Sequence, residues 1–281
     1  MKLIADSGST KTDWCMIDRS GSRKTIQTVG INPYYMSPDA IRDVLDKELY
    51  PYLNPTSIKQ VHFYGAGCST NSKCRTVESV LGAFFTDAEI EVEHDLLGAA
   101  RALCDHKPGI ACILGTGSNS CYFNGREIAS NAVSLGYLLG DEGSGAFLGK
   151  QLLTDYFLKY LPDDLSLKLQ EDHHLTLETT LDALYNKPKP NRFLASFSLF
   201  IHKNKEHPYC RQLLEKSFDD FIRISVSQYP GYKNVDVNFL GSVAYFFRDE
   251  LEKSAIKADI RLGLILRSAI DGLANYHTIE I

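Results

Sequence analysis

The stretch Leu3-Ile4-Ala5-Asp6-Ser7-Gly8-Ser9-Thr10-Lys11-Thr12 is a short apolar run that ends in a turn of small and polar residues. The apolar run predicts a β-strand, and Trp14–Ile17 predicts a second strand that returns after the turn. Such a turn exposes N–H groups and hydroxyls that can bind a phosphate, and Asp6 at the strand end could hold a hydrated Mg²⁺ ion. A plain hairpin turn favours the same residue types, so this stretch alone leaves both interpretations open.

A second turn of the same kind, Gly115-Thr116-Gly117-Ser118-Asn119, follows the predicted strand Ile110–Leu114. One small-residue turn in each half of the chain could bind a polyphosphate from two sides. The pair therefore favours a nucleotide-binding protein over two unrelated hairpins.

The two halves of the chain share one predicted order: three strands, a helix, a strand, a helix, a strand and a helix. The two turns are about 109 residues apart, whereas Gly65 and Gly241, which end later strands, are 176 apart. The second copy therefore needs an insertion, which the helical pattern of Ala146–Tyr229 supplies. We predict an α/β fold with an N-terminal domain over 1–107 and a C-terminal domain over 108–281.

The end of the chain is predicted to form a strand at Asp259–Leu262 and a helix at Leu264–Tyr276. This final helix is expected to pack back across the domain boundary.

Three further segments could carry chemistry. Asp95 ends a predicted strand and opens a helix, where a carboxylate can either cap the helix or act as a general base. The loop Gly136–Gly145 holds four glycines and an Asp-Glu pair, which suits a rigid loop that presents a carboxylate to a sugar. Gly241-Ser242 ends a strand and begins a helix, a geometry that allows close approach of an adenosine.

The composition excludes several classes of protein. The 281 residues are 44% hydrophobic and 23% charged with a net charge of −5, which excludes a disordered chain and makes a nucleic-acid partner unlikely. No apolar stretch reaches the ~18–20 residues of a membrane span, and the N-terminus lacks a signal-peptide core. The seven cysteines form no CxxC pair and are expected to be reduced core thiols. We expect a soluble cytoplasmic protein.

Five motifs in this order resemble the sugar-kinase, Hsp70 and actin ATPase superfamily. Within it they look most like the N-acetylglucosamine kinase and BadF/BadG/BcrA/BcrD ATPase family. The loop GDEGS is the most specific of them. The motifs are DSGSTKTDW (6–14), HDLLGAARA (94–102), ILGTGSNS (113–120), SLGYLLGDEGSG (134–145) and FLGSV (239–243).

The resemblance implies two RNase H-like (actin-like ATPase) domains with mixed five-stranded sheets that close on ATP and Mg²⁺. It implies phosphoryl transfer to the 6-hydroxyl of an amino sugar, with Asp95 as the base and Asp6 at the metal. Members of the family often form dimers, and the sequence leaves the oligomeric state open. The implied nucleotide-binding residues are Asp6, Gly8, Ser9, Thr10, Lys11, Thr116, Gly117, Gly241 and Ser242. The implied sugar-binding residues are Asn32, Ser118, Asn119, Gly136, Tyr137 and Asp141, with Tyr34 as the aromatic ring that usually follows the asparagine.

Two other functions fit the same motifs. An activator ATPase of the BadF/BadG type would share a [4Fe–4S] cluster between subunits, and it would need exposed cysteines that this pattern does not display. A nucleotide-binding regulatory protein without kinase activity is the second alternative, and the joint presence of Asp6, Asp95 and Asp141 argues against it. Among amino sugars and glucose, the sequence does not indicate which sugar is phosphorylated.

Overall fold

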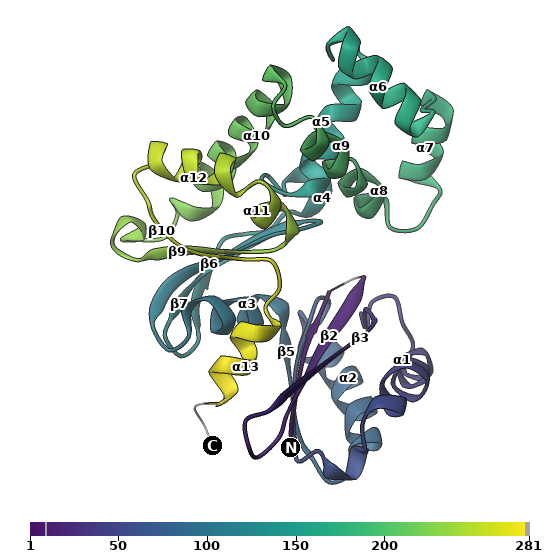
Figure 1. Cartoon of the computed structure of the whole chain (residues 1–281), viewed down its shortest axis with the longest axis vertical. Coiled ribbons are helices and arrows are strands. Elements are labelled where there is room, and N and C mark those ends of the chain that lie inside the picture. Colours follow the sequence, from purple (N-terminus) through teal and green to yellow (C-terminus); the bar gives the residue numbers. More distant parts are fainter. Residues whose placement is uncertain (9, 279–281) are drawn as a thin grey trace. The chain divides into compact units, whose positions relative to one another are not determined.

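The computed structural model of the chain describes residues 1–8 and 10–278, which form two compact units (Figure 1). The first unit comprises residues 1–107 and 125–127 together with the C-terminal segment that begins at Ser268. The second unit comprises residues 108–124 and 128–267. The C-terminal segment, expected to pack back across the boundary, thus belongs to the first unit.

The first unit is built on a mixed five-stranded sheet with the strand order β3-β2-β1-β4-β5. The central strand β1 runs antiparallel to β2 and parallel to β4, and its register places Asp6 opposite Asp13 of β2. The strands are β1 (Lys2–Ser7), β2 (Lys11–Ile17), β3 (Arg23–Val29), β4 (Gln60–Gly65) and β5 (Glu89–His94).

Helices cover both faces of this sheet. Helix α1 (Pro38–Val44) begins at Ser37, whose hydroxyl accepts a hydrogen bond from the Ala40 amide, and it continues through a π turn (Leu45–Leu49) and a 3₁₀ turn (Tyr50–Tyr52). These elements and α2 (Asn71–Phe84) share one apolar core with alternate side chains of the strands. Helices α3 (Asp95–Cys104) and α13 (Ile270–Thr278) pack against each other on the other face (Figure 1).

The second unit repeats this sheet. Its strand order is β10-β9-β6-β7-β8, in which β6 is antiparallel to β7 and parallel to β9, as β1 is to β2 and β4. The predicted pair of mixed five-stranded sheets is therefore confirmed. The strands are β6 (Pro108–Leu114), β7 (Ser118–Asn124), β8 (Ile128–Asn131), β9 (Asp236–Leu240) and β10 (Arg261–Leu266).

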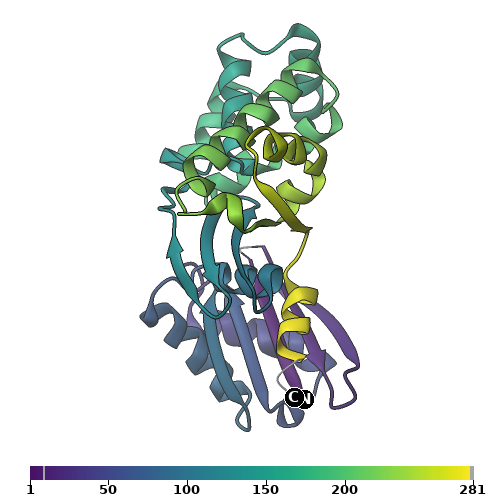
Figure 2. The same ribbon diagram turned by 90° about the vertical axis from the view of Figure 1, so that its left-hand side faces the viewer.

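The chain between β8 and β9 is helical, and its helices gather in one group in the second unit (Figure 2). They share a continuous apolar core with Ile110, Cys112 and Leu114 of β6, so this insertion extends the core of the sheet. The helices are α4 (Gly136–Leu139), α5 (Gly145–Phe157), α6 (Asp163–His173), α7 (Leu177–Tyr185), α8 (Pro190–Ser196), α9 (Ser198–Lys203) and α10 (Pro208–Phe221). A π turn, η4 (Ile222–Val226), extends α10, and α11 (Ser242–Phe246) and α12 (Arg248–Lys257) follow β9.

The prediction for the last strand and helix is wrong in its boundaries. Strand β10 extends to Leu266, and α13 begins at Ile270, so Leu264 belongs to the strand. The register of β10 against β9 shifts between Leu262 and Ile265, where Asn238 Oδ1 accepts a hydrogen bond from the Leu264 amide at 2.8 Å. This bulge interrupts the alternation of side chains that would have marked a longer strand.

The structure also bears on the cysteines and on membrane spans. Six of the seven cysteines are buried and Cys74 is half-buried, as expected for core thiols. None of the described helices has the length and apolar character needed to cross a membrane.

The close contact between α5 and α8 depends on Gly149, because an added Cβ there would collide with the Leu194 carbonyl. We expect Gly149→Ala to lower the free energy of unfolding by about 2 kcal/mol or more, since backbone must move to make room. The matched control is Gly82→Ala in α2, where no atom lies within 4 Å of the added Cβ and better helix propensity should stabilise by up to about 1 kcal/mol. Urea denaturation measures both changes, and equal stability of the two variants would contradict the prediction.

Helix α13 brings His277 into the interior of the first unit. The His277 ring stacks on His62 with centroids 3.8 Å apart, and its Nε2 lies 2.8 Å from the Tyr64 hydroxyl. Burial lowers the pKa of His277 from 6.5 to about 3. Between these two values the unfolded chain binds a proton that the folded chain does not, so folding stability falls as pH decreases.

We therefore expect the unfolding free energy of the native protein to decrease as pH falls from about 6.5 toward 3. His277→Phe keeps a ring in the stack and removes the titrating group, so its stability should depend less on pH across this window. Denaturant titrations at several pH values measure the two slopes. Identical slopes for both proteins would show that His277 does not carry the effect.

Candidate functional site

The first small-residue turn is held at its base by buried hydroxyls. The Ser7 and Thr12 hydroxyl oxygens are 2.7 Å apart, and the Ser7 Oγ is also 3.0 Å from both the amide and the carbonyl of Ile31. The Gly8 amide donates to the Lys11 carbonyl at 3.0 Å, which closes the turn. The Ser7 side chain is buried and anchors the turn through these hydrogen bonds.

The apex of this turn is exposed, as a ligand-binding loop requires. Gly8, Thr10 and Lys11 are exposed, and the Lys11 ammonium pairs with Asp13 at 2.7 Å. Ser9, also predicted to bind nucleotide, lies outside the described residues.

Three carboxylates gather in the first unit near this turn. Asp6 Oδ2 accepts a hydrogen bond from the Ala269 amide at 3.3 Å, just before α13. The pKa of Asp6 is raised to about 6: burial raises it most, and the negative charges of Asp13 and Asp95 also raise it, whereas the Ala269 amide and Lys11 lower it. A cation beside Asp6 would relieve this repulsion.

These residues fit a hydrated Mg²⁺ ion. Mg²⁺ keeps several of its waters and needs only one or two protein carboxylates. Across residues 1–8 and 10–278, no three His, Cys, Asp or Glu side chains are grouped as a cage for a metal ion. A metal at Asp6 would therefore be held by few protein ligands, with phosphate oxygens and water as the others.

Asp95 is the first residue of α3 but not its cap. His94 caps the helix, because its Nδ1 accepts a hydrogen bond from the Leu97 amide at 3.2 Å. Burial raises the pKa of Asp95, while the charge of His94 and the amides of Leu96 and Asp95 itself act in the opposite direction. The Asp95 carboxylate also acts electrostatically on Asp6.

Asn32 is the predicted sugar-binding residue of the first unit. It is buried, and its Oδ1 accepts a hydrogen bond from the Tyr34 amide at 2.9 Å. The side chain lies against Gly67, whose φ of +91° and lack of a Cβ allow this approach. Tyr34 is half-exposed, and its hydroxyl lies 3.0 Å from Ser69 Oγ.

In the second unit, the turn after β6 is joined to the loop before α5. The amides of Gly145 and Ala146 donate to the carbonyls of Gly115 and Thr116 at 2.8 and 3.0 Å. The Gly115 amide in turn donates to the Gly117 carbonyl at 3.0 Å. Two motifs that are separated in the sequence therefore form one rigid structure.

Asp141 belongs to the same structure. A Cβ at Gly117 would lie 2.8 Å from Asp141 Oδ2, so only glycine allows the carboxylate this position. Burial raises the pKa of Asp141, and Glu142 raises it further, whereas the Ser118 amide and Lys150 lower it.

Gly241 brings the predicted adenosine motif to the turn. Its φ is +121°, and an added Cβ would collide with the Leu114 carbonyl just before Gly115. Ser242 follows as the first residue of α11. The structure therefore brings together Thr116, Gly117, Gly241 and Ser242, the four predicted nucleotide-binding residues of this unit.

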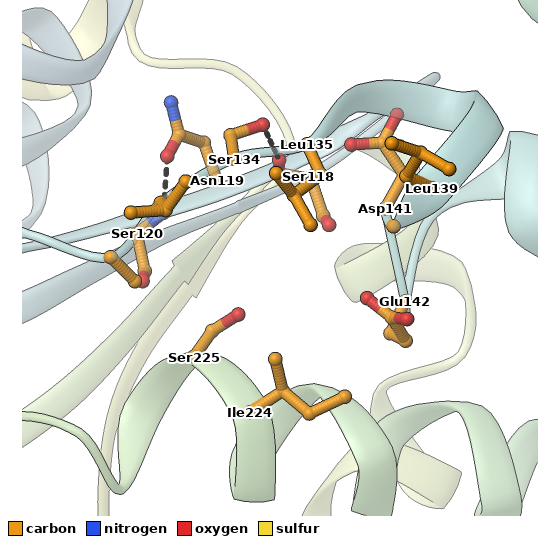
Figure 3. A pocket seen from close by; sticks show the side chains of 13 residues that line it. Ser118, Asn119, Ser120, Ser134, Leu135, Leu139, Asp141, Glu142, Ile224 and Ser225 are labelled. Carbon is orange, nitrogen blue, oxygen red and sulfur yellow. Dashed lines mark hydrogen bonds between the residues drawn. The ribbon is translucent and has the colours of Figure 1, made fainter.

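A pocket of about 180 Å³ opens beside these motifs in the second unit (Figure 3). Ser118, Asn119 and Asp141 line it, as three of the predicted sugar-binding residues. The other residues that line it are Ser120, Ala132, Val133, Ser134, Leu135, Leu139, Gly140, Glu142, Ile224 and Ser225.

Gly136 and Tyr137 are not among the residues that line this pocket. Tyr137 instead lines a separate, mostly apolar cavity of about 530 Å³ among the helices of the insertion. Its carbonyl accepts a hydrogen bond from Lys150 Nζ at 3.0 Å. Gly136 starts the short helix α4 with a φ of +67°. Their proposed contact with a sugar stays a prediction.

Sequence reasoning missed Ser134, Glu142, Ile224 and Ser225. Glu142 lies inside the GDEGS motif, so the motif itself could have indicated it. Ile224 and Ser225 lie in the π turn η4, about a hundred residues after Ser118, and no motif marks them.

No model of a known protein family matches the chain, and no curated protein matches it in sequence. Among solved structures, a Porphyromonas gingivalis protein provisionally named as an N-acetylglucosamine kinase is 43% identical, with a TM-score of 0.93 over 99% of this chain and 98% of that one. A Chromobacterium violaceum protein with the same provisional name has a TM-score of 0.74 at 18% identity, over 98% of each chain. A ROK family glucokinase from Streptomyces griseus, solved with glucose and AMPPNP, has a TM-score of 0.56 at 15% identity over 99% of this chain and 98% of that one.

The second and third of these similarities concern the fold alone. The similarity to the Porphyromonas gingivalis protein combines 43% identity with coverage of nearly the whole length of both proteins. The chain therefore belongs to the N-acetylglucosamine kinase family.

Proposed function

We propose that this protein is an ATP-dependent kinase that phosphorylates the 6-hydroxyl of N-acetylglucosamine or a close amino sugar. The observation that carries the proposal is the 43% identity, over nearly the whole chain, to the Porphyromonas gingivalis protein of that provisional name. The junction of the Gly115–Gly117 turn with the loop before α5 supports it, because that junction joins the turn predicted to bind phosphate to the loop predicted to bind the sugar. Since the reaction consumes ATP, we expect it to take place in the cytoplasm.

The nucleotide would be bound by both small-residue turns. Amides and hydroxyls of Thr10, Thr116 and Gly117 would donate to phosphate oxygens, Gly8 would let the phosphates approach the backbone closely, and Gly241-Ser242 would contact the adenosine. Asp6 would hold Mg²⁺, which neutralises charge on the phosphates when bound. Lys11 lies next to the first turn and supplies positive charge there.

Asp95 would accept the proton of the sugar hydroxyl. As the hydroxyl oxygen forms its bond to the γ-phosphorus, the bond from that phosphorus to the bridging oxygen of ADP breaks, and the proton passes to the Asp95 carboxylate. The raised pKa of Asp95 makes its carboxylate a better base than an exposed aspartate.

The sugar would be bound chiefly by Ser118, Asn119 and Asp141. All three residues line one pocket, and their hydroxyl, amide and carboxylate groups could exchange hydrogen bonds with sugar hydroxyls (Figure 3). Asn32 of the first unit would be a further sugar ligand.

A panel of sugars tests the activity directly. We expect ADP release in a coupled assay with N-acetylglucosamine, ATP and Mg²⁺, and formation of the 6-phosphate by mass spectrometry and NMR. Glucose, which lacks the amide, should be used less efficiently. ATP hydrolysis that no sugar stimulates would overturn the kinase proposal and favour a regulatory protein.

If Asp95 is the general base, its substitution should lower the rate of phosphoryl transfer without weakening ATP binding. Asp95→Asn should lower kcat by about 10²–10⁴-fold, the usual contribution of a general base, while ATP binding measured by calorimetry changes little. The matched control is Asp105→Asn at the exposed far end of α3, which should keep full activity. Full activity in Asp95→Asn would exclude this residue as the base.

A further inference from the structure

One wall of the pocket comes from a part of the chain that carries no recognised motif. Helix α10 widens at its end into the π turn η4, whose Ile222 and Val226 are buried in the core. Of the three residues between them, Arg223 is exposed, whereas Ile224 and Ser225 are half-buried and line the pocket. Figure 3 shows both side chains directed at the pocket from the side opposite Ser118 and Asn119. π turns inside helices occur often at functional sites.

Tyr229 fixes the position of the η4 wall relative to β7 and the chain after β8. Its side chain is buried, and its hydroxyl lies 2.8 Å from Ser120 Oγ and accepts a hydrogen bond from the Ala132 amide at 2.8 Å. The hydroxyl thereby links the segment after η4 to β7 and to the chain that follows β8. The Ile224 and Ser225 side chains are therefore part of a preformed pocket.

The polar and apolar groups of the pocket are unevenly distributed. Ser118, Asn119 and Asp141 offer hydrogen bonds, as the hydroxyls of a sugar ring require. Large apolar side chains also line the pocket: Val133, Leu135, Leu139 and Ile224. Val133, Leu135 and Leu139 are 78%, 58% and 77% exposed, so an alkyl group bound there would cover apolar surface. A plain hexose, with hydroxyls around its ring, has no such group.

The charge of the pocket is negative. Asp141 and Glu142 line it, and the described lining residues include no Lys, Arg or His. Lys150 acts on Asp141 with opposite charge, but it does not line the pocket. An anionic substituent on the sugar would therefore meet like charges without a compensating cation.

We propose that Ile224 and Ser225 determine specificity by contacting a short, uncharged acyl group on the sugar amine. Ile224 packs against the alkyl part of the acyl group, and the Ser225 hydroxyl hydrogen-bonds to its amide. The pocket volume of about 180 Å³ lies below the ~300 Å³ of sites for drug-sized ligands, which suits a single sugar ring. The inference rests on the proposed kinase function and assigns the acyl-binding side of the same site.

The first test enlarges the space for the acyl group. With N-acetylglucosamine and N-propionylglucosamine as substrates, Ile224→Ala should raise the ratio of kcat/KM for propionyl over acetyl by about tenfold, the scale of one methylene in a pocket. Ser225→Ala should raise KM for both acylated sugars with little change in kcat. Ser227→Ala is the matched control, since Ser227 is an exposed neighbour that does not line the pocket.

General damage to the fold cannot produce the expected gain for the longer acyl group. An unchanged propionyl-to-acetyl ratio in Ile224→Ala, with normal kinase activity, would overturn the inference while leaving the proposed function intact. Absence of sugar phosphorylation in the native protein would instead overturn the proposed function. Calorimetric titration of the sugars without ATP then still reports whether Ile224→Ala changes the acyl preference.

The second test addresses charge. N-oxamoylglucosamine and N-oxalylglucosamine have nearly the same shape and differ in the charge of the terminal group. The native protein should prefer the neutral oxamoyl sugar by about tenfold or more, and Glu142→Gln should reduce this preference. Equal use of both sugars by the native protein would overturn the proposed selection against anions.

Discussion

The second unit is organised by two hydrogen bonds between the start of α5 and the turn after β6. The amides of Gly145 and Ala146 have no partner within their own helix, because the first amides of any helix lack one. They donate instead to the carbonyls of Gly115 and Thr116. The helix start is thereby satisfied by the turn, and the turn takes its shape from the helix.

Several other contacts depend on this junction. Asp141 can lie against Gly117 only because that residue has no Cβ. Gly143, with a φ of +77°, donates its amide to the Ser217 hydroxyl of α10 at 3.0 Å. Helix α10 leads into η4, which supplies the opposite wall of the pocket. One set of backbone contacts thus connects the predicted phosphate turn, the sugar loop and the acyl-binding side.

The two units share a sheet topology but carry different chemistry. In the first unit the three-residue turn after β1 lies next to Asp6, whose carboxylate is repelled by Asp13 and Asp95, and this repulsion favours a cation. In the second unit the turn after β6 is also three residues long, and it adjoins the adenosine motif and the pocket. Each of the two similar sheets thus has a short turn at the equivalent place, after β1 in the first unit and after β6 in the second. The helical insertion, which only the second copy has, adds the π-turn wall of the pocket.

The sequence by itself determined the repeated order of strands and helices, the two turns and the positions of the motifs. These features depend on local chemistry: apolar runs, small residues in turns and capping residues such as Ser37. Only the tertiary structure decided that β10 extends to Leu266, because its bulge is stabilised by Asn238 from a neighbouring strand. It also decided that Tyr137 lines a separate cavity and that Ile224 and Ser225 line the pocket. Contacts between distant segments depend on packing and backbone hydrogen bonds, which leave no local pattern in the sequence.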